Sequence, residues 1–171
     1  METAYLSLGS NQGDREGYLQ QATDLIRARV GSVVCCSPIY ETAPWGRFEV
    51  GEDKPFLNMA VEVQTELTPL ELLATVNAIE QDLGRRRPGG SSSGEARRVY
   101  VSRPIDIDII FYGSEVVDMP RLTIPHPRMQ LRRFVLQPLC DMAPDFVHPV
   151  LGKNLRQLLE ACPDNSIPSR L

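Results

Sequence analysis

Residues 56–84 read FLNMAVEVQTELTPLELLATVNAIEQDLG, and this stretch contains the clearest strand pattern and the clearest helix pattern of the chain. Apolar and polar side chains alternate through residues 56–64, which predicts a half-buried strand. The segment 68–71, TPLE, supplies a threonine N-cap, a first-turn proline and a capping-box glutamate. Apolar residues then recur at helical spacing as far as Gly84, a residue typical of helix ends. The sequence therefore predicts a strand followed directly by an amphipathic helix.

The residues before this stretch predict another strand and helix. Residues 4–8, AYLSL, favour a strand. Apolar residues at three- and four-residue spacing predict a helix over 14–29, with Gly31 as its C-cap. A second strand is expected at 32–40, where Pro38 indicates an edge or a strand end.

The residues after it complete the expected order of elements. Residues 85–104 are rich in arginine, glycine and serine, and we expect a mobile loop there. The later candidates are strands at 105–112 and 115–117, an extended segment at 120–127, and helices at 128–140 and 155–162. The resulting βαββαβ order predicts the ferredoxin-like α+β class, with an antiparallel sheet covered by two helices on one face and extra C-terminal elements.

Length and composition indicate one ordinary globular domain over residues 1–171. The net charge is −4, from 18 basic and 22 acidic residues, which argues against a general nucleic-acid binder. No apolar run reaches the ~18 residues that a membrane span needs, and the N-terminus does not resemble a secretory signal. Four cysteines without metal-site spacing predict reduced thiols in a cytoplasmic protein. They are Cys35, Cys36, Cys140 and Cys162.

Arginine residues are concentrated in two places in this acidic chain. One cluster comprises Arg85, Arg86, Arg87, Arg97, Arg98 and Arg103, and the other comprises Arg128, Arg132 and Arg133. Local guanidinium clusters favour a small anionic ligand such as a polyphosphate. The alternative is an arginine-rich loop that is simply solvated.

The segment 104–110, PIDIDII, carries the strongest chemical signal. In a strand Asp106 and Asp108 share one face, with Cα atoms ~6.5–7 Å apart. Two carboxylates at that distance repel each other by ~2 kcal/mol at an effective dielectric constant near 20. One or two bound Mg²⁺ ions would offset this repulsion. The alternative is the solvent-facing side of an amphipathic strand.

Several other residues have a functional and a structural interpretation. His126 stands between two prolines and could donate to a phosphate, or it could be structural. Asn58 could pair with the edge of a heterocycle, or it could be a hydrated amide. The aromatic residues Phe56, Phe134 and Trp45 suit a flat ring substrate, but they could equally belong to the core.

Fragments of the chain match one family in order. They are LGSN at 8–11, YETAP at 40–44, FLN at 56–58, IE at 79–80, GR at 84–85, RPIDIDI at 103–109, LTIPHPRM at 122–129, RRFVLQPL at 132–139 and AP at 143–144. With these fragments the chain resembles the 6-hydroxymethyl-7,8-dihydropterin pyrophosphokinases of folate biosynthesis. The resemblance covers roughly residues 4–160.

The resemblance implies transfer of pyrophosphate from ATP to the hydroxymethyl group of a reduced pterin, with release of AMP. Asp106 and Asp108 would hold two Mg²⁺ ions that bridge the ATP phosphates. Arg85 and Arg103 would assist catalysis. The residues matching the pterin pocket are Thr42, Pro44, Asn58, Phe56, Phe134 and Trp45. The residues matching nucleotide contacts are Glu80, Arg87, Arg121, Thr123, His126 and Arg132.

Two other classes of function stay open beside this one. A non-catalytic ferredoxin-like module that binds a small ligand would fit the fold order but not the paired carboxylates. A Mg²⁺-dependent phosphohydrolase or nuclease would use the same aspartate pair, although the net negative charge argues against a nuclease. We expect a monomer whose partners are ATP and the pterin, with no nucleic acid and no membrane.

Overall fold

The computed structural model describes residues 1–42, 55–84 and 104–171. Within these ranges the elements are, in order, β1 (Glu2–Ser10), α1 (Arg15–Arg29), β2 (Gly31–Cys36), β3 (Tyr40–Thr42), β4 (Phe56–Thr65), α2 (Pro69–Gly84), β5 (Asp106–Tyr112), β6 (Val117–Met119), β7 (Leu122–Ile124), the 3-10 turn η2 (Met129–Leu131), α3 (Arg133–Met142), α4 (Leu155–Glu160) and β8 (Ser169–Arg170).

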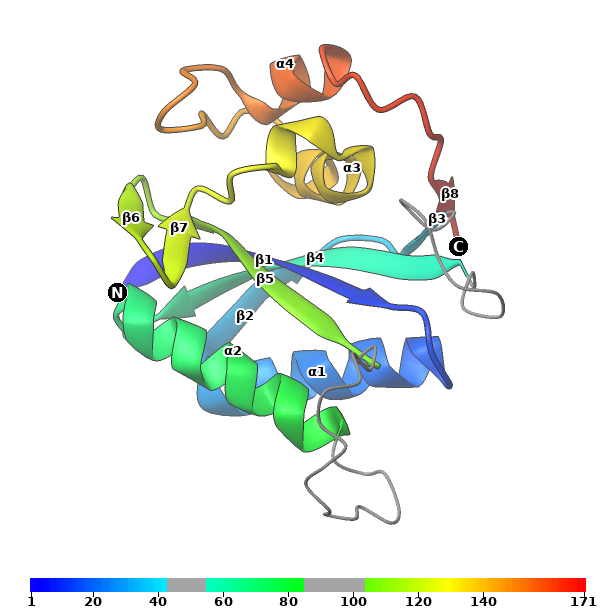
Figure 1. Ribbon diagram of the computed structural model, residues 1–171, viewed down its shortest axis with the longest axis vertical. Helices are drawn as coiled ribbons and strands as arrows, with labels where there is room; N and C mark the ends of the chain where they lie inside the picture. The colour runs from blue at the N-terminus through cyan, green and yellow to red at the C-terminus, as the bar shows by residue number, and fades with distance from the viewer. Residues whose placement is uncertain (43–54, 85–103) are drawn as a thin grey trace.

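The strands form one antiparallel sheet and a separate hairpin. The sheet order is β5-β1-β4-β3-β8, and β2 also pairs with β4. Figure 1 shows α1 and α2 against one face of this sheet, while α3 and α4 lie over the other. The expected ferredoxin-like α+β fold is therefore confirmed, and the C-terminal elements form a third layer.

The first two helices begin where their capping residues predict. Asp14 accepts a hydrogen bond from the backbone N–H of Gly17 at 3.0 Å. Thr68 and Glu71 exchange the two bonds of a capping box, at 2.9 and 3.2 Å. The predicted cap at Gly31 is wrong, because Val30 ends α1 in a helical conformation and Gly31 already begins β2. A side chain at Gly31 would collide with the backbone oxygen of Gln64, 2.0 Å from its Cβ.

The single strand expected at 32–40 is divided in two. β2 ends at Cys36 and β3 begins at Tyr40, with Pro38 between them. Pro38 has no N–H to donate to a sheet, so the prediction of a strand end at this residue is confirmed. Ser37 keeps the two strands on β4, because its N–H donates to the oxygen of Ala60 and its Oγ accepts from the N–H of Ala60, both at 2.9 Å.

Two expectations for the C-terminal half are corrected. The strand expected at 115–117 forms instead at 117–119, and it pairs with β7 rather than returning along β5. The helix expected at 128–140 is interrupted at Arg132, whose backbone is extended. One turn of 3-10 helix lies before this residue and α3 begins after it.

The middle of β4 is buried on both faces, although its alternation predicts only one buried face; on the second face Glu62 is partly buried and Gln64 is exposed. Its odd-numbered side chains from Leu57 to Val63 pack beneath α1 and α2 in the first core. Ala60 belongs to a second core between the sheet and the C-terminal helices. That core contains Tyr5, Ala60, Ile110, Phe111, Met129, Val135, Leu136, Leu139, Leu155, Leu158 and Cys162. The expectation of a polar face failed because α3 covers a surface that the strand pattern assigns to solvent.

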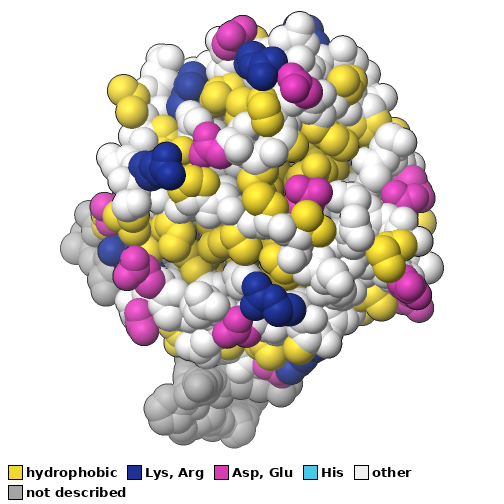
Figure 2. All heavy atoms as spheres, turned by 180° about the vertical axis from the view of Figure 1, so that it is seen from behind, with side chains coloured by type: hydrophobic (Ala, Val, Ile, Leu, Met, Phe, Trp, Pro, Cys, Tyr) yellow, Lys and Arg dark blue, Asp and Glu magenta, His cyan; other side chains and the backbone are white. Residues whose placement is uncertain are grey.

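Strand β2 forms an accessible side of the sheet. Val34 is 53% exposed, and Cys35 and Cys36 are exposed free thiols. Figure 2 shows the molecule from the side opposite to the view of Figure 1. On the surface seen there, apolar side chains gather near the middle and charged side chains lie around them. In the part of the chain that the structure describes, none of the helices combines the length and apolar character of a membrane span.

Candidate functional site

The two aspartates of β5 lie side by side on the exposed side of their strand. Asp106 and Asp108 are exposed, whereas Ile107 between them is 4% exposed and belongs to the first core. In the register of the sheet, Asp106 is opposite Gly9 and Asp108 is opposite Ser7 of β1. The expected common face is confirmed. Carboxylate oxygens in this arrangement are suitable ligands for Mg²⁺.

Glu80 supports the strand between these carboxylates. It lies on α2, is 6% exposed, and accepts a hydrogen bond from the N–H of Ile107 at 2.7 Å. β5 is the last strand in the sheet order, so this bond satisfies a backbone donor on its outer side. The structure therefore gives Glu80 a direct contact with the strand that carries both aspartates.

His126 and Arg132 lie near Asp108. The N–H of His126 donates to the oxygen of Ile110 at 3.1 Å, which ties this residue to β5. Burial lowers the pKa of His126 below its ordinary value, while the carboxylate of Asp108 opposes that shift. Burial also lowers the pKa of Arg132, again against the attraction of Asp108. The structure thus brings one aspartate, an imidazole and a guanidinium together.

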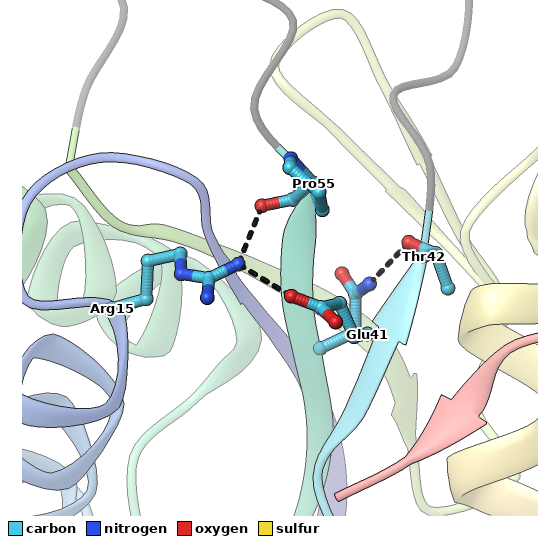
Figure 3. Close-up of polar contacts among 5 residues, drawn as sticks. Arg15, Glu41, Thr42 and Pro55 are labelled. Atoms are coloured by element: carbon cyan, nitrogen blue, oxygen red, sulfur yellow. Dashed lines mark hydrogen bonds and ion pairs between the residues drawn. The ribbon is translucent and has the colours of Figure 1, made fainter.

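Asn58 occupies the same face of the sheet, two strands away from Asp106. It is 3% exposed and its Nδ2 donates to Thr42 Oγ1 at 2.9 Å, the bond drawn beside Thr42 in Figure 3. The alternative of a hydrated surface amide is therefore wrong. Because the amide nitrogen is engaged by Thr42, the carbonyl oxygen is the atom available to accept a bond from a ligand.

Tyr40 anchors the strand beside Asn58 to the C-terminal layer. It pairs with Asn58 across β3 and β4, is 6% exposed, and donates its hydroxyl hydrogen to Asp141 Oδ2 of α3. Burial and this hydrogen bond raise the pKa of Tyr40 to about 12. The phenol therefore stays protonated and continues to donate over the whole physiological pH range.

Arg15 connects the end of β3 to the start of β4, next to Thr42 and Phe56 of the predicted pterin pocket. Its Nη1 donates to Glu41 Oε2 at 2.9 Å and to the backbone oxygen of Pro55 at 3.0 Å. Figure 3 shows the guanidinium reaching from the start of α1 to both strands. One side chain thus fixes the end of β3 relative to the start of β4.

The beginning of α3 brings Phe134 and Arg132 to the same side of the sheet as Asn58. The Arg132 guanidinium lies 5.9 Å from the centre of the Phe134 ring, within the range of a cation–π contact. The C-terminal tail supports this helix start, because Asp164 Oδ2 accepts from the N–H of Arg133 at 3.0 Å. Phe134 is partly buried and packs against the second core.

The remaining predicted residues lie on the β6–β7 hairpin or outside the described ranges. Arg121 lies in the exposed turn of the hairpin, and Thr123 is exposed on β7, where it lines a pocket with His126. Five predicted residues lie outside the described ranges: Pro44, Trp45, Arg85, Arg87 and Arg103. The expected mobile loop at 85–104 lies outside them as well, except for Pro104.

Three features of the site are missed by reasoning from the sequence. These are the Tyr40–Asp141 bond, the Arg15–Glu41 pair and the place of Gly9 between Asn58 and Asp106. The first two join residues 101 and 26 positions apart, so no local pattern could reveal them. Gly9 is part of the LGSN fragment, which marks the position but gives no reason for it.

Comparison with known proteins shows the family of this chain. Residues 5–144 match the model of the 7,8-dihydro-6-hydroxymethylpterin-pyrophosphokinase (HPPK) family. The chain belongs to this family. An HPPK of Porphyromonas gingivalis, named 2-amino-4-hydroxy-6-hydroxymethyldihydropteridine pyrophosphokinase, is 45% identical over 150 residues, which are 87% of this chain and 95% of that protein. The HPPK of Pseudomonas aeruginosa is 38% identical over 169 residues, covering 98% of this chain and 96% of the relative.

Solved structures show the same HPPK fold. An HPPK-DHPS protein in complex with substrates has a TM-score of 0.69 and 17% identity, covering 94% of this chain and 43% of that chain. A wild-type Plasmodium falciparum HPPK-DHPS also has a TM-score of 0.69, with 19% identity over 94% of this chain and 43% of that chain. This chain thus spans less than half of those longer proteins, and the likeness concerns the fold. The family suggested by the sequence fragments is confirmed.

Proposed function

We propose that this chain transfers the pyrophosphoryl group of ATP to the hydroxymethyl group of 6-hydroxymethyl-7,8-dihydropterin, forming the pterin diphosphate and AMP in folate biosynthesis. Membership of the HPPK family and the names of its relatives support this reaction. The observation that carries the proposal is the single row of residues across the sheet, with the Asn58 amide at one end and the Asp106 carboxylate at the other.

The aspartate pair is the proposed metal site. Magnesium is usually bound by one or two carboxylates together with substrate phosphates, and Asp106 and Asp108 supply that number of carboxylates on one exposed face. Two Mg²⁺ ions bound there would neutralise phosphate charge and favour attack by the pterin hydroxyl. Glu80 accepts from the N–H of the intervening Ile107 and so supports the strand that carries both carboxylates.

The proposed phosphate contacts lie next to Asp108. Arg132 and His126 would bind phosphate oxygens, and Arg121 and Thr123 would contact the nucleotide from the β6–β7 hairpin. The hydroxymethyl oxygen of the pterin would attack the β-phosphorus and release its proton to solvent, the bond between that phosphorus and the α–β bridging oxygen would break, and AMP would leave with the electron pair. Arg85, Arg87 and Arg103 remain predicted phosphate ligands, with Arg85 and Arg103 assisting the transfer.

The proposed pterin pocket surrounds Asn58. Its carbonyl oxygen would accept from the ring N–H groups, and Thr42 holds the amide in that orientation. Phe56 and Phe134 would stack on the two faces of the ring, and Pro44 and Trp45 remain predicted members of the pocket. We also propose that the protein is a monomer with a single domain and that it acts in the cytoplasm.

An AMP-release assay tests the reaction. The protein is incubated with ATP, Mg²⁺ and the reduced pterin, and each component is omitted in turn. Equal amounts of AMP and pterin diphosphate, formed only in the complete mixture, are the expected result. ADP or free phosphate formed without the pterin would instead indicate a kinase or hydrolase, and binding of both substrates without AMP would indicate a non-catalytic module.

A further inference from the structure

Gly9 lies at the centre of the site, and its backbone conformation does not explain why it is glycine. Its Cα is in register with Asn58 on β4 and with Asp106 on β5. Among the described residues only Gly13, Gly113 and Gly152 have positive φ. A glycine inside a strand lowers its stability and often marks a close approach of another group. Glycine at this position is explained instead by the contacts that a side chain there would make.

The space above Gly9 is bordered by two residues of the pterin pocket. A Cβ atom added at Gly9 would lie 3.0 Å from Asn58 Oδ1 and 3.8 Å from Phe56 Cδ1. The first distance is tighter than an ordinary van der Waals contact, so Asn58 would have to move. Asn58 is 97% buried and its amide nitrogen is bonded to Thr42, which leaves the side chain little freedom to turn away.

The row across the sheet also carries no side chain between Asn58 and Asp106, because Gly9 has none. Neighbouring strands lie about 4.8 Å apart, so the Cα atoms of Asn58 and Asp106 are about 9.5 Å from each other. Gly9 is the only residue between them in this row. A flat heterocycle can therefore extend from the Asn58 carbonyl oxygen towards the carboxylate without meeting a side chain from the strand beneath.

We infer that Gly9 is a specificity-determining residue for the pterin, because its bare Cα allows Asn58 Oδ1 to keep the position from which it accepts the ring N–H groups. This inference rests on the proposed function and deepens it. It gives Gly9 of the LGSN fragment a role in substrate recognition. The added methyl of Gly9→Ala would displace the acceptor without touching the nucleotide side of the site.

Binding to the full chain tests this role. Titration calorimetry measures the affinity for 6-hydroxymethyl-7,8-dihydropterin in the presence of Mg²⁺ and a non-hydrolysable ATP analogue. We expect Gly9→Ala to weaken pterin binding at least tenfold while binding of the ATP analogue changes less than twofold. Gly84→Ala is the matched control, because within residues 1–42, 55–84 and 104–171 its added methyl meets only Pro104 Cδ, at 3.7 Å, and it should bind the pterin like the wild type.

A double variant identifies the group through which the methyl acts. If the methyl displaces Asn58, then Gly9→Ala/Asn58→Ala binds the pterin within twofold of Asn58→Ala alone. Losses that multiply would show that the methyl obstructs something else and would overturn the inference, as would wild-type pterin affinity in Gly9→Ala. If Gly9→Ala fails to fold, the double variant should fold, and its failure to do so would also overturn the inference. Absence of pterin binding by the wild type would refute the proposed function itself.

Discussion

The two faces of the central sheet differ in how completely they are covered. The face beneath α1 and α2 is apolar along its whole length, from Ala4 to Leu8 on β1 and from Ile107 to Ile109 on β5. The other face changes along the same strands, from Tyr5 and Phe111 at one end to the polar residues at the other. The C-terminal layer covers the apolar end, whereas Asp106 and Asp108 at the polar end are exposed.

This difference shows how one sheet can be both a stable scaffold and a binding surface. Every residue of the polar row has a neighbour on the same strand that is held in the first core, because successive side chains point to opposite faces. Ile107, between the two aspartates, is the clearest case. The site is therefore positioned by a core that it does not itself belong to.

The largest expected effect is the loss of one carboxylate from the polar end. Asp106→Asn should lower AMP formation at least about 1,000-fold, equivalent to about 4 kcal/mol of barrier, because the amide is a poorer Mg²⁺ ligand of the same shape. The unfolding midpoint should stay within about 2 °C of wild type, since this side chain is exposed. Rate assays and thermal unfolding measure both.

Glu2→Gln is the control for this substitution. Glu2 is likewise exposed on a strand, but it lies at the end of β1 away from Gly9, so its loss should leave AMP formation within twofold of wild type. Comparable activity of the Asp106 and Glu2 variants at saturating Mg²⁺ would remove the proposed metal site from β5.

Matched leucine truncations measure how each of the two helical layers contributes to stability and to pterin binding. Leu72 on α2 and Leu136 on α3 are both 0% exposed, so each change to alanine should lower the free energy of unfolding by about 2–5 kcal/mol. Only Leu136→Ala should also weaken pterin binding, because α3 carries Phe134. Denaturant titrations and calorimetry separate the two effects. Equal loss of pterin affinity in both variants would contradict the division of roles between the layers.

A smaller effect is expected at Glu80, the residue of α2 that contacts β5. Glu80→Ala removes the acceptor of the Ile107 N–H and should lower kcat about tenfold, which corresponds to about 1.4 kcal/mol. Glu80→Gln keeps an acceptor oxygen and should recover most of the rate. The Mg²⁺ concentration giving half-maximal activity should rise only in Glu80→Ala. Failure of the glutamine variant to recover would show that the charge, rather than the hydrogen bond, is required.

The smallest effect is expected at His148, next to Phe111 of the second core, and concerns the pH dependence of stability. His148 is 4% exposed, packs edge-on against Phe111, and its Nδ1 accepts from the N–H groups of Val150 and Leu151. Burial lowers the pKa of His148 below its ordinary 6.5. The unfolded chain therefore binds the proton more readily, so this contribution to stability is complete above pH 6.5 and is lost as the pH falls through the lower folded pKa.

His148→Asn keeps an acceptor for the two N–H groups and removes the titration. We expect its free energy of unfolding to fall less steeply than that of the wild type between pH 6.5 and 5. Urea titrations at several pH values measure this slope. Identical slopes would show that His148 does not couple stability to pH.

The local patterns of the chain predicted much of this structure. Capping residues predicted the starts of α1 and α2, and the period-2 and helical patterns predicted β4, β5 and the first core. The LGSN, RPIDIDI and LTIPHPRM fragments predicted the family and placed the two aspartates on one face. These features are determined by neighbours in the sequence, where periodicity and capping act directly.

The division of the second face of the sheet follows from the packing of the whole chain. Whether Asn58 is buried, whether Glu80 supports β5 and whether a side chain at Gly9 would meet Asn58 all depend on contacts between residues distant in the sequence. An alternating strand presents a polar residue in the same way to solvent, to a covering helix or to a ligand. The choice among these depends on where the C-terminal layer packs, because burial is a property of the assembled chain and not of a segment.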